Sequence, residues 1–76
     1  MNTNNIKAIF VEIENLPHRT NIYYHTVTNH NSWTWYNEKN VPDYIVELMN
    51  KNRPSKQWET EYTNTGTKTQ TIVYKF

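Results

Sequence analysis

Only one stretch of the chain has the spacing of an amphipathic helix, and this restricts the folds open to it. In residues 40 to 52, NVPDYIVELMNKN, apolar side chains recur at the i, i+3, i+4, i+7 and i+8 positions of one helical face. They are Val41, Tyr44, Ile45, Leu48 and Met49. Asn40 is suited to cap the start, and Pro54 prevents the helix from continuing. The apolar face of this helix must therefore pack on something other than a second helix.

The rest of the chain is typical of strands and turns. Strands are predicted over residues 6 to 14, 22 to 28, 32 to 37, 56 to 63 and 68 to 76. The first is apolar on both faces, which is typical of a central strand, and the others are rich in β-branched and aromatic residues. The Asn-rich turn at 29 to 31 should make the third strand antiparallel to the second, and Gly66 should form a hairpin loop between the last two.

These elements predict an α+β fold in the order β-β-β-α-β-β. It consists of a small antiparallel sheet with one amphipathic helix packed on one face. With 76 residues, the chain should form a single domain over positions 1–76, because neither half could build a core. It has no cysteine, so disulfides and cysteine-based zinc sites cannot support so small a core. Aromatic residues, at 14% of the chain, can supply large buried surfaces instead.

The beginning MNTNNIKAIF has neither the basic region nor the long apolar region of a signal peptide, and no apolar run is long enough to span a bilayer. We therefore expect a cytoplasmic protein that does not bind membranes. Heavy use of Asn, Lys, Ile, Tyr and Thr is what an AT-rich genome would encode, which indicates a low-GC bacterium, its phage or its plasmid.

Side chains able to carry chemistry are few. His25 and His30 are five positions apart with His18 before them, a spacing that matches no compact metal-ligand motif. A metal-free ribonuclease needs little more than a few polar side chains. Candidates for it are His18, Arg19, Tyr24 and His25. The net charge of +1 is nevertheless far from that of a basic toxin, so we predict no enzyme, no metal site and no cofactor.

The most basic stretch is KNRPSKQWETEY, where the helix is expected to end. Basic side chains beside an aromatic ring are what a single-stranded nucleic-acid platform uses. The alternative function is therefore a single-stranded nucleic-acid-binding module with a basic-aromatic patch at residues 51–58, formed by Lys51, Arg53, Lys56 and Trp58. The simpler interpretation is that these cations satisfy the helix dipole and the last carbonyls. A separate segment, NVPDY at residues 40 to 44 where the helix begins, resembles the KTSC-type modules, whose strands also lead through Val-Pro into a helix. This resemblance implies association with nucleic acid, but the motif that names the family is absent, and we assign no family.

The leading prediction is a protein that docks on another protein. Trp and Tyr are favoured in interface cores, and the chain has more of them than a core of its size needs. One helix leaves the opposite sheet face uncovered, which marks a docking site or a homodimer. That face should carry Ile6/Phe10 or Ile9/Val11 from the first strand and Tyr23/Val27 or Ile22/Tyr24 from the second.

The candidate partner-binding residues are Tyr23, Trp33, Trp35 and Tyr36. Residues two apart on a strand share a face, so Trp33 and Trp35 should stand together and Tyr36 should point the other way. We expect the two indoles to lie beneath the helix beside Trp58, which leaves Tyr36 on the exposed face. The predicted function is a small non-enzymatic binding protein, an accessory or inhibitory protein of a phage or mobile element.

Overall fold

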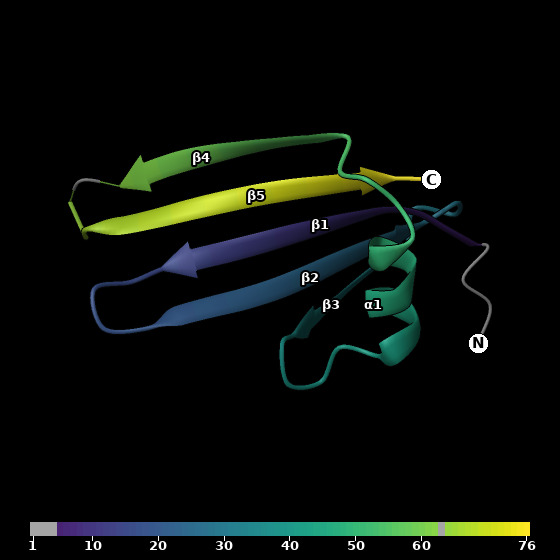
Figure 1. The fold of residues 1–76 in the computed structure, drawn as a ribbon, viewed down its shortest axis with the longest axis horizontal. Coiled ribbons are helices and arrows are strands. Elements are labelled where there is room, and N and C mark those ends of the chain that lie inside the picture. The colour runs from purple at the N-terminus through teal and green to yellow at the C-terminus, as the bar shows by residue number, and fades with distance from the viewer. Residues whose placement is uncertain (1–4, 63) are drawn as a thin grey trace.

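A computed structural model describes residues 5–62 and 64–76, and within this part the chain forms five strands and one helix (Figure 1). Along the chain the elements are β1 (Ile6–Asn15), β2 (Thr20–Thr28), β3 (Trp33–Asn37), α1 (Asp43–Asn50), β4 (Lys56–Tyr62) and β5 (Thr67–Lys75). The prediction of an α+β fold with a small antiparallel sheet and a single helix is confirmed. Residue 63, which the prediction included in the fourth strand, lies outside the described residues.

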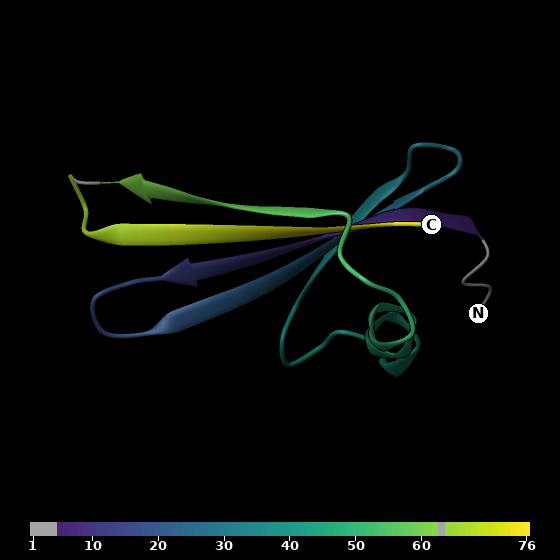
Figure 2. The same ribbon diagram turned by 45° about the horizontal axis from the view of Figure 1, so that its top comes forward.

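All five strands belong to one antiparallel sheet, in the spatial order β3-β2-β1-β5-β4. β1 is the central strand, as its two apolar faces indicated, and it pairs with β2 on one side and β5 on the other. β3 and β4 are the two edges. The segment that joins them contains α1, so the helix has to cross a face of the sheet, and Figure 2 shows it on one side only.

The core lies between α1 and the sheet face toward it. Ile9 and Ile45 are fully buried, and Ile6, Val11 and Met49 complete the cluster around them. Partly buried side chains surround this cluster: Ile13, Ile22, Tyr24, Val41, Tyr44, Val46, Leu48, Ile72 and Tyr74. The apolar face predicted for the helix is therefore the face that packs.

The helix is shorter than predicted, eight residues instead of the stretch from 40 to 52. Its N-cap is Pro42, which makes no side-chain capping bond, so the prediction that Asn40 caps the helix is wrong. The Asn40 Oδ1 instead accepts a hydrogen bond of 2.8 Å from the backbone N–H of Asn37, whose own Oδ1 accepts from the N–H groups of Lys39 and Asn40. The Asn40 side chain is thus used to close the turn after β3.

A helix of this length covers only part of the sheet. Eight residues span about 12 Å, whereas the ten residues of β1 extend over about 33 Å. Figures 1 and 2 show α1 near one end of the strands, and the β1–β2 and β4–β5 hairpin loops at the other end extend beyond it. In the described residues, no helix has the length and apolar character needed to cross a membrane.

Two turns adopt the conformation that their residues indicated. Asn31 has φ 60° in the β2–β3 turn, and Gly66 has φ 68° in the β4–β5 hairpin. Both angles fall in the left-handed region, which asparagine and glycine tolerate best. The Thr28 hydroxyl accepts from the N–H groups of His30 and Ser32, which also holds the first turn.

Candidate functional site

The sheet face turned away from α1 is called the open face. Side chains that are directly paired across antiparallel strands lie on the same face. Because Ile9 and Val11 pack under the helix, the alternate residues of β1 belong to the open face. Phe10 is one of these alternate residues, and the strand register assigns five further aromatic side chains to the open face: Tyr23, Trp33, Trp35, Trp58 and Tyr62.

A β-bulge decides which residues of β1 share this face. The register between β1 and β2 shifts between Ile6 and Ala8, with Lys7 as the extra residue. Ile6 consequently joins the core under the helix, although Ala8, Phe10 and the following alternate residues face the other way. The predicted pair Ile6/Phe10 is therefore split between the two faces, and this correction could not be made from spacing alone.

Trp33 and Trp35 lie on the open face, and each is 61% exposed. The prediction that they lie beneath the helix is wrong. The register of β3 explains the difference, because Tyr36 is paired with Tyr24, which belongs to the core side of the sheet. The intervening tryptophans must then point away from α1.

Tyr36 lies on the helix side, so it is separated from the other three candidate partner-binding residues. Burial, and then a side-chain hydrogen bond with Tyr36, raises the pKa of the Tyr44 hydroxyl. The structure thus brings Tyr23, Trp33 and Trp35 together on one face and assigns Tyr36 to the contact between sheet and helix.

The aromatic rings of the open face are in contact in two pairs. The ring centroids of Phe10 and Trp33 are 5.5 Å apart. Those of Tyr23 and Trp35 are 6.0 Å apart with the planes inclined at 70°, an edge-to-face arrangement. Phe10 was predicted for the uncovered face only as one member of the pair Ile6/Phe10 and was not among the four candidate partner-binding residues; the burial of Ile9 and Val11 and its contact with Trp33 assign it to the open face.

The open face has apolar side chains that are hidden although no helix covers them. Val73 is fully buried, and Ala8 and Val27 are nearly so. Ala8 and Val27 share a groove of about 370 Å³ with Phe10 and Trp33. The larger rings therefore shield these small residues, and the rings themselves remain in water.

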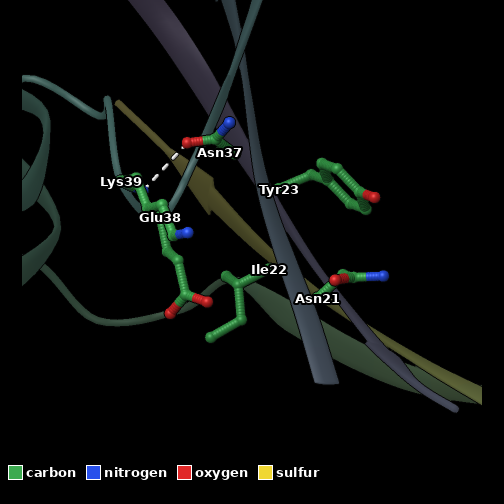
Figure 3. A pocket seen from close by; sticks show the side chains of 6 residues that line it. All are labelled: Asn21, Ile22, Tyr23, Asn37, Glu38 and Lys39. Atoms are coloured by element: carbon green, nitrogen blue, oxygen red, sulfur yellow. Dashed lines mark hydrogen bonds between the residues drawn. The ribbon is translucent and has the colours of Figure 1, made fainter. Parts of the chain in front are cut away.

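A second depression, of about 220 Å³, lies where β2 meets the turn after β3 (Figure 3). Tyr23 and Ile22 project to opposite sides of β2 there, Tyr23 toward the open face and Ile22 toward the helix side. The lining is polar, with Asn21, Asn37, Glu38 and Lys39 around it.

The predicted basic-aromatic patch is only partly assembled. The Lys56 ammonium lies over the ring of Trp58, 5.8 Å from its centroid, and both residues are on the open face at the edge strand β4. Lys51 is the C-cap residue of α1, and its backbone N–H donates to the Glu47 carbonyl. The side chain that donates to a carbonyl at this end of the helix is that of Asn52, whose Nδ2 bonds to the Leu48 carbonyl at 2.7 Å. Arg53 is exposed in the following loop.

The open face carries charged side chains of both signs. Glu12 and Glu14 project from β1, Lys56 and Lys75 project from β4 and β5, and Lys7 at the bulge of β1 lines the groove beside Phe10 and Trp33. Glu14 accepts a hydrogen bond of 3.1 Å from the Asn21 side chain. This surface is therefore of mixed charge, with Glu12 and Glu14 on its central strand and Lys7, Lys56 and Lys75 around them.

Among residues 5–62 and 64–76, no three His, Asp or Glu side chains are grouped so that they could hold a metal ion. Comparison of the chain with protein-family models, with curated proteins and with solved structures finds no match. The exposed aromatic side chains of the open face are accordingly the feature of the molecule that points to a function.

Proposed function

We propose that this protein is a non-enzymatic binding protein that docks on a protein partner through its open face. The observation that carries the proposal is the exposure of Trp33 and Trp35, each 61% in water, beside Phe10 and Tyr23. Indole rings bury large apolar areas, and tryptophan and tyrosine are the residues that most often dominate binding energy in protein interfaces. A contiguous apolar surface of this kind favours a binding site over a solvated face.

The two carboxylates on the central strand of the open face favour a protein over a nucleic acid as partner. Binding to nucleic acid depends on neutralising phosphates with lysine and arginine. Lys7, Lys56 and Lys75 are present on the open face, but Glu12 and Glu14 project from its central strand and would repel a phosphate chain laid across the aromatic rings. Protein interfaces tolerate such mixed charge around an aromatic centre.

Single-stranded nucleic acid is the second candidate, and the stacking of Lys56 on Trp58 is the observation that favours it. An exposed ring with a cation over one face can receive a base on its other face, and the cation can bind a phosphate. This contact lies at β4, on the opposite edge of the sheet from Trp33 and Trp35.

The biological setting that we propose is unchanged from the sequence: an accessory or inhibitory protein of a phage or mobile element in a low-GC bacterium. Small size and composition support it. An inhibitor that acts by blocking a surface needs a rigid platform and no catalytic group. A sheet with preformed aromatic contacts meets that requirement, because little side-chain freedom has to be lost on binding.

The test is affinity capture from a lysate of the source organism, followed by affinity measurement on the recovered protein. Trp33→Ala and Trp35→Ala should each weaken binding by about 30-fold or more, the effect of an interface hot spot. Tyr62→Ala is the matched control, because Tyr62 is an exposed aromatic residue at the far end of the same face. A partner that is retained by both tryptophan variants would contradict the proposed docking face.

Fluorescence anisotropy with labelled single-stranded oligonucleotides tests the second candidate. Binding that falls steeply as salt rises and that Trp58→Ala abolishes would favour it over the first. No change in anisotropy at low salt would exclude binding of single-stranded nucleic acid as the function.

A further inference from the structure

Four side chains of the open face surround one depression of about 260 Å³: Glu12, Tyr23, His25 and Trp35. Glu12 is paired in register with Tyr23, and His25 with Trp35, so the four come from the adjacent strands β1, β2 and β3. The rings of Tyr23 and Trp35, inclined at 70° to each other, line it together with Glu12 and His25.

The Glu12 carboxylate is partly buried and makes no hydrogen bond or ion pair with any other residue that the structure describes. The neighbouring Glu14 differs, since it accepts a hydrogen bond from Asn21. The lysines of this face are engaged elsewhere or lie on other strands: Lys7 donates to the Asn31 side chain, Lys56 lies over Trp58, and Lys75 is on β5. A negative charge next to two aromatic rings is thus left without a cation of its own.

Aromatic faces and a carboxylate attract the same kind of group. The face of an indole or phenol ring carries negative electrostatic potential and attracts a cation within about 6 Å of the ring centre. A carboxylate accepts two parallel hydrogen bonds from a guanidinium, whose flat shape also stacks on rings. Arginine combines both contacts in one side chain and is enriched in protein interfaces.

We propose that this depression is a receptor for a cationic side chain, best matched by arginine, that the protein partner presents. The inference rests on the proposed function, because it states what the docking face takes from its partner. The partner is a protein other than a second copy of this chain. The carboxylate of Glu12 would complete the ion pair, and Tyr23 and Trp35 would enclose the aliphatic and planar parts of the cation.

The test is a nuclear magnetic resonance titration with two small probes, N-acetyl-arginine amide and its neutral isostere N-acetyl-citrulline amide. The chain has three tryptophans, so its three indole N–H signals can be assigned with single Trp→Phe variants. The arginine probe should shift the Trp35 signal in a saturable way and leave the Trp58 signal unchanged. The citrulline probe should bind about tenfold more weakly or not at all, because it lacks the charge.

Glu12→Gln and Glu14→Gln are matched variants, since both remove one negative charge from the same face of β1. Glu12→Gln should lower the affinity for the arginine probe about threefold, the size expected for a partly exposed ion pair. Glu14→Gln should leave this affinity unchanged. Equal binding of citrulline, or an equal effect of the two variants, would overturn the proposal. The folded state of each variant is checked by its amide spectrum.

Other occupants give different results. If a second copy covers this face, the chain will sediment as a dimer, and the Trp35 signal will not respond to the probe, which overturns the proposal. If single-stranded DNA shifts the Trp35 signal and the arginine probe does not, the site binds nucleic acid instead. Capture of a partner that depends on Trp33 but not on Glu12 would refute the arginine site and leave the proposed function standing. If the arginine probe binds as predicted but no partner protein is captured, the arginine site stands and the proposed docking function is refuted.

Discussion

The positions of Trp35 and Ile45 predict a small and a large loss of stability, respectively, when each side chain is truncated, and the difference can be worked out from their exposure. A tryptophan side chain can bury up to about 250 Å². With 61% of Trp35 exposed, about 100 Å² of it is hidden from water. At about 25 cal/mol per Å² this surface contributes at most about 2.5 kcal/mol, and about 1 kcal/mol once the surface already hidden in the unfolded chain and under the remaining alanine is allowed for.

Ile45 has no exposed surface and lies at the centre of the core between α1 and β1. Ile45→Ala removes three buried carbon atoms and leaves a cavity, which costs about 2–5 kcal/mol. A small domain has a free energy of unfolding of only about 5–15 kcal/mol. We therefore expect Ile45→Ala to remove a large part of the stability and Trp35→Ala to remove little of it.

Urea unfolding followed by far-ultraviolet circular dichroism measures both effects. Tryptophan fluorescence is less suitable, because all three tryptophans are already partly exposed to water in the folded state, Trp33 and Trp35 by 61% and Trp58 by 45%. If Trp35→Ala lowers the free energy of unfolding by about 3–5 kcal/mol, the loss typical of a buried aromatic residue, then Trp35 packs in the core and the assignment of the open face is wrong. Trp33→Ala, with equal exposure, should repeat the small effect.

Three further outcomes are expected. Gly66→Ala should destabilise the fold by about 1–2 kcal/mol in thermal or urea unfolding, because φ is 68° there; an unchanged midpoint would contradict that conformation. Asn37→Ala should cost about 1 kcal/mol, since the Asn37 Oδ1 accepts two backbone N–H bonds in the turn that leads to α1, and Glu38→Ala is its control. Burial and the hydrogen bond with Tyr36 raise the pKa of Tyr44 from its ordinary 10.0, so the folded state favours the protonated hydroxyl. The resulting stabilisation is complete below pH 10.0 and is lost as pH rises through the higher pKa of the folded state. The Tyr44→Phe variant should therefore lose less stability than the unchanged protein over this pH range. Parallel curves of unfolding free energy against pH for the two proteins would refute the assignment.

The strands and the helix could be predicted from the sequence because their signals are local. The spacing of apolar residues in NVPDYIVELMNKN identifies the face of α1 that buries Ile45 and Met49. Its start could not be placed as well, because Asn40 can cap a helix or close a turn, and hydrogen bonds with Asn37 decide between the two. Gly66 and Asn31 marked turns for the same local reason, a backbone angle that other residues resist.

The candidate site was harder to predict because it depends on register. Alternation along β3 establishes by itself that Trp33 and Trp35 share one face and Tyr36 has the other. It does not say which of the two faces meets the helix, since a shift of one residue would exchange them. The choice is made by the pairing of Tyr36 with Tyr24 and by the bulge at Lys7, which separates Ile6 from Phe10.

The sequence by itself thus determined the strands and the helix of this protein, the central place of β1 and the position of Trp33 and Trp35 on the same side of β3. Only the tertiary structure decided that these indoles face water and that Glu12 lies beside Tyr23 and Trp35. The physical reason is that helix and strand signals come from neighbours in the chain. The composition of a sheet face comes from strands that are distant in sequence and are aligned only when the sheet forms.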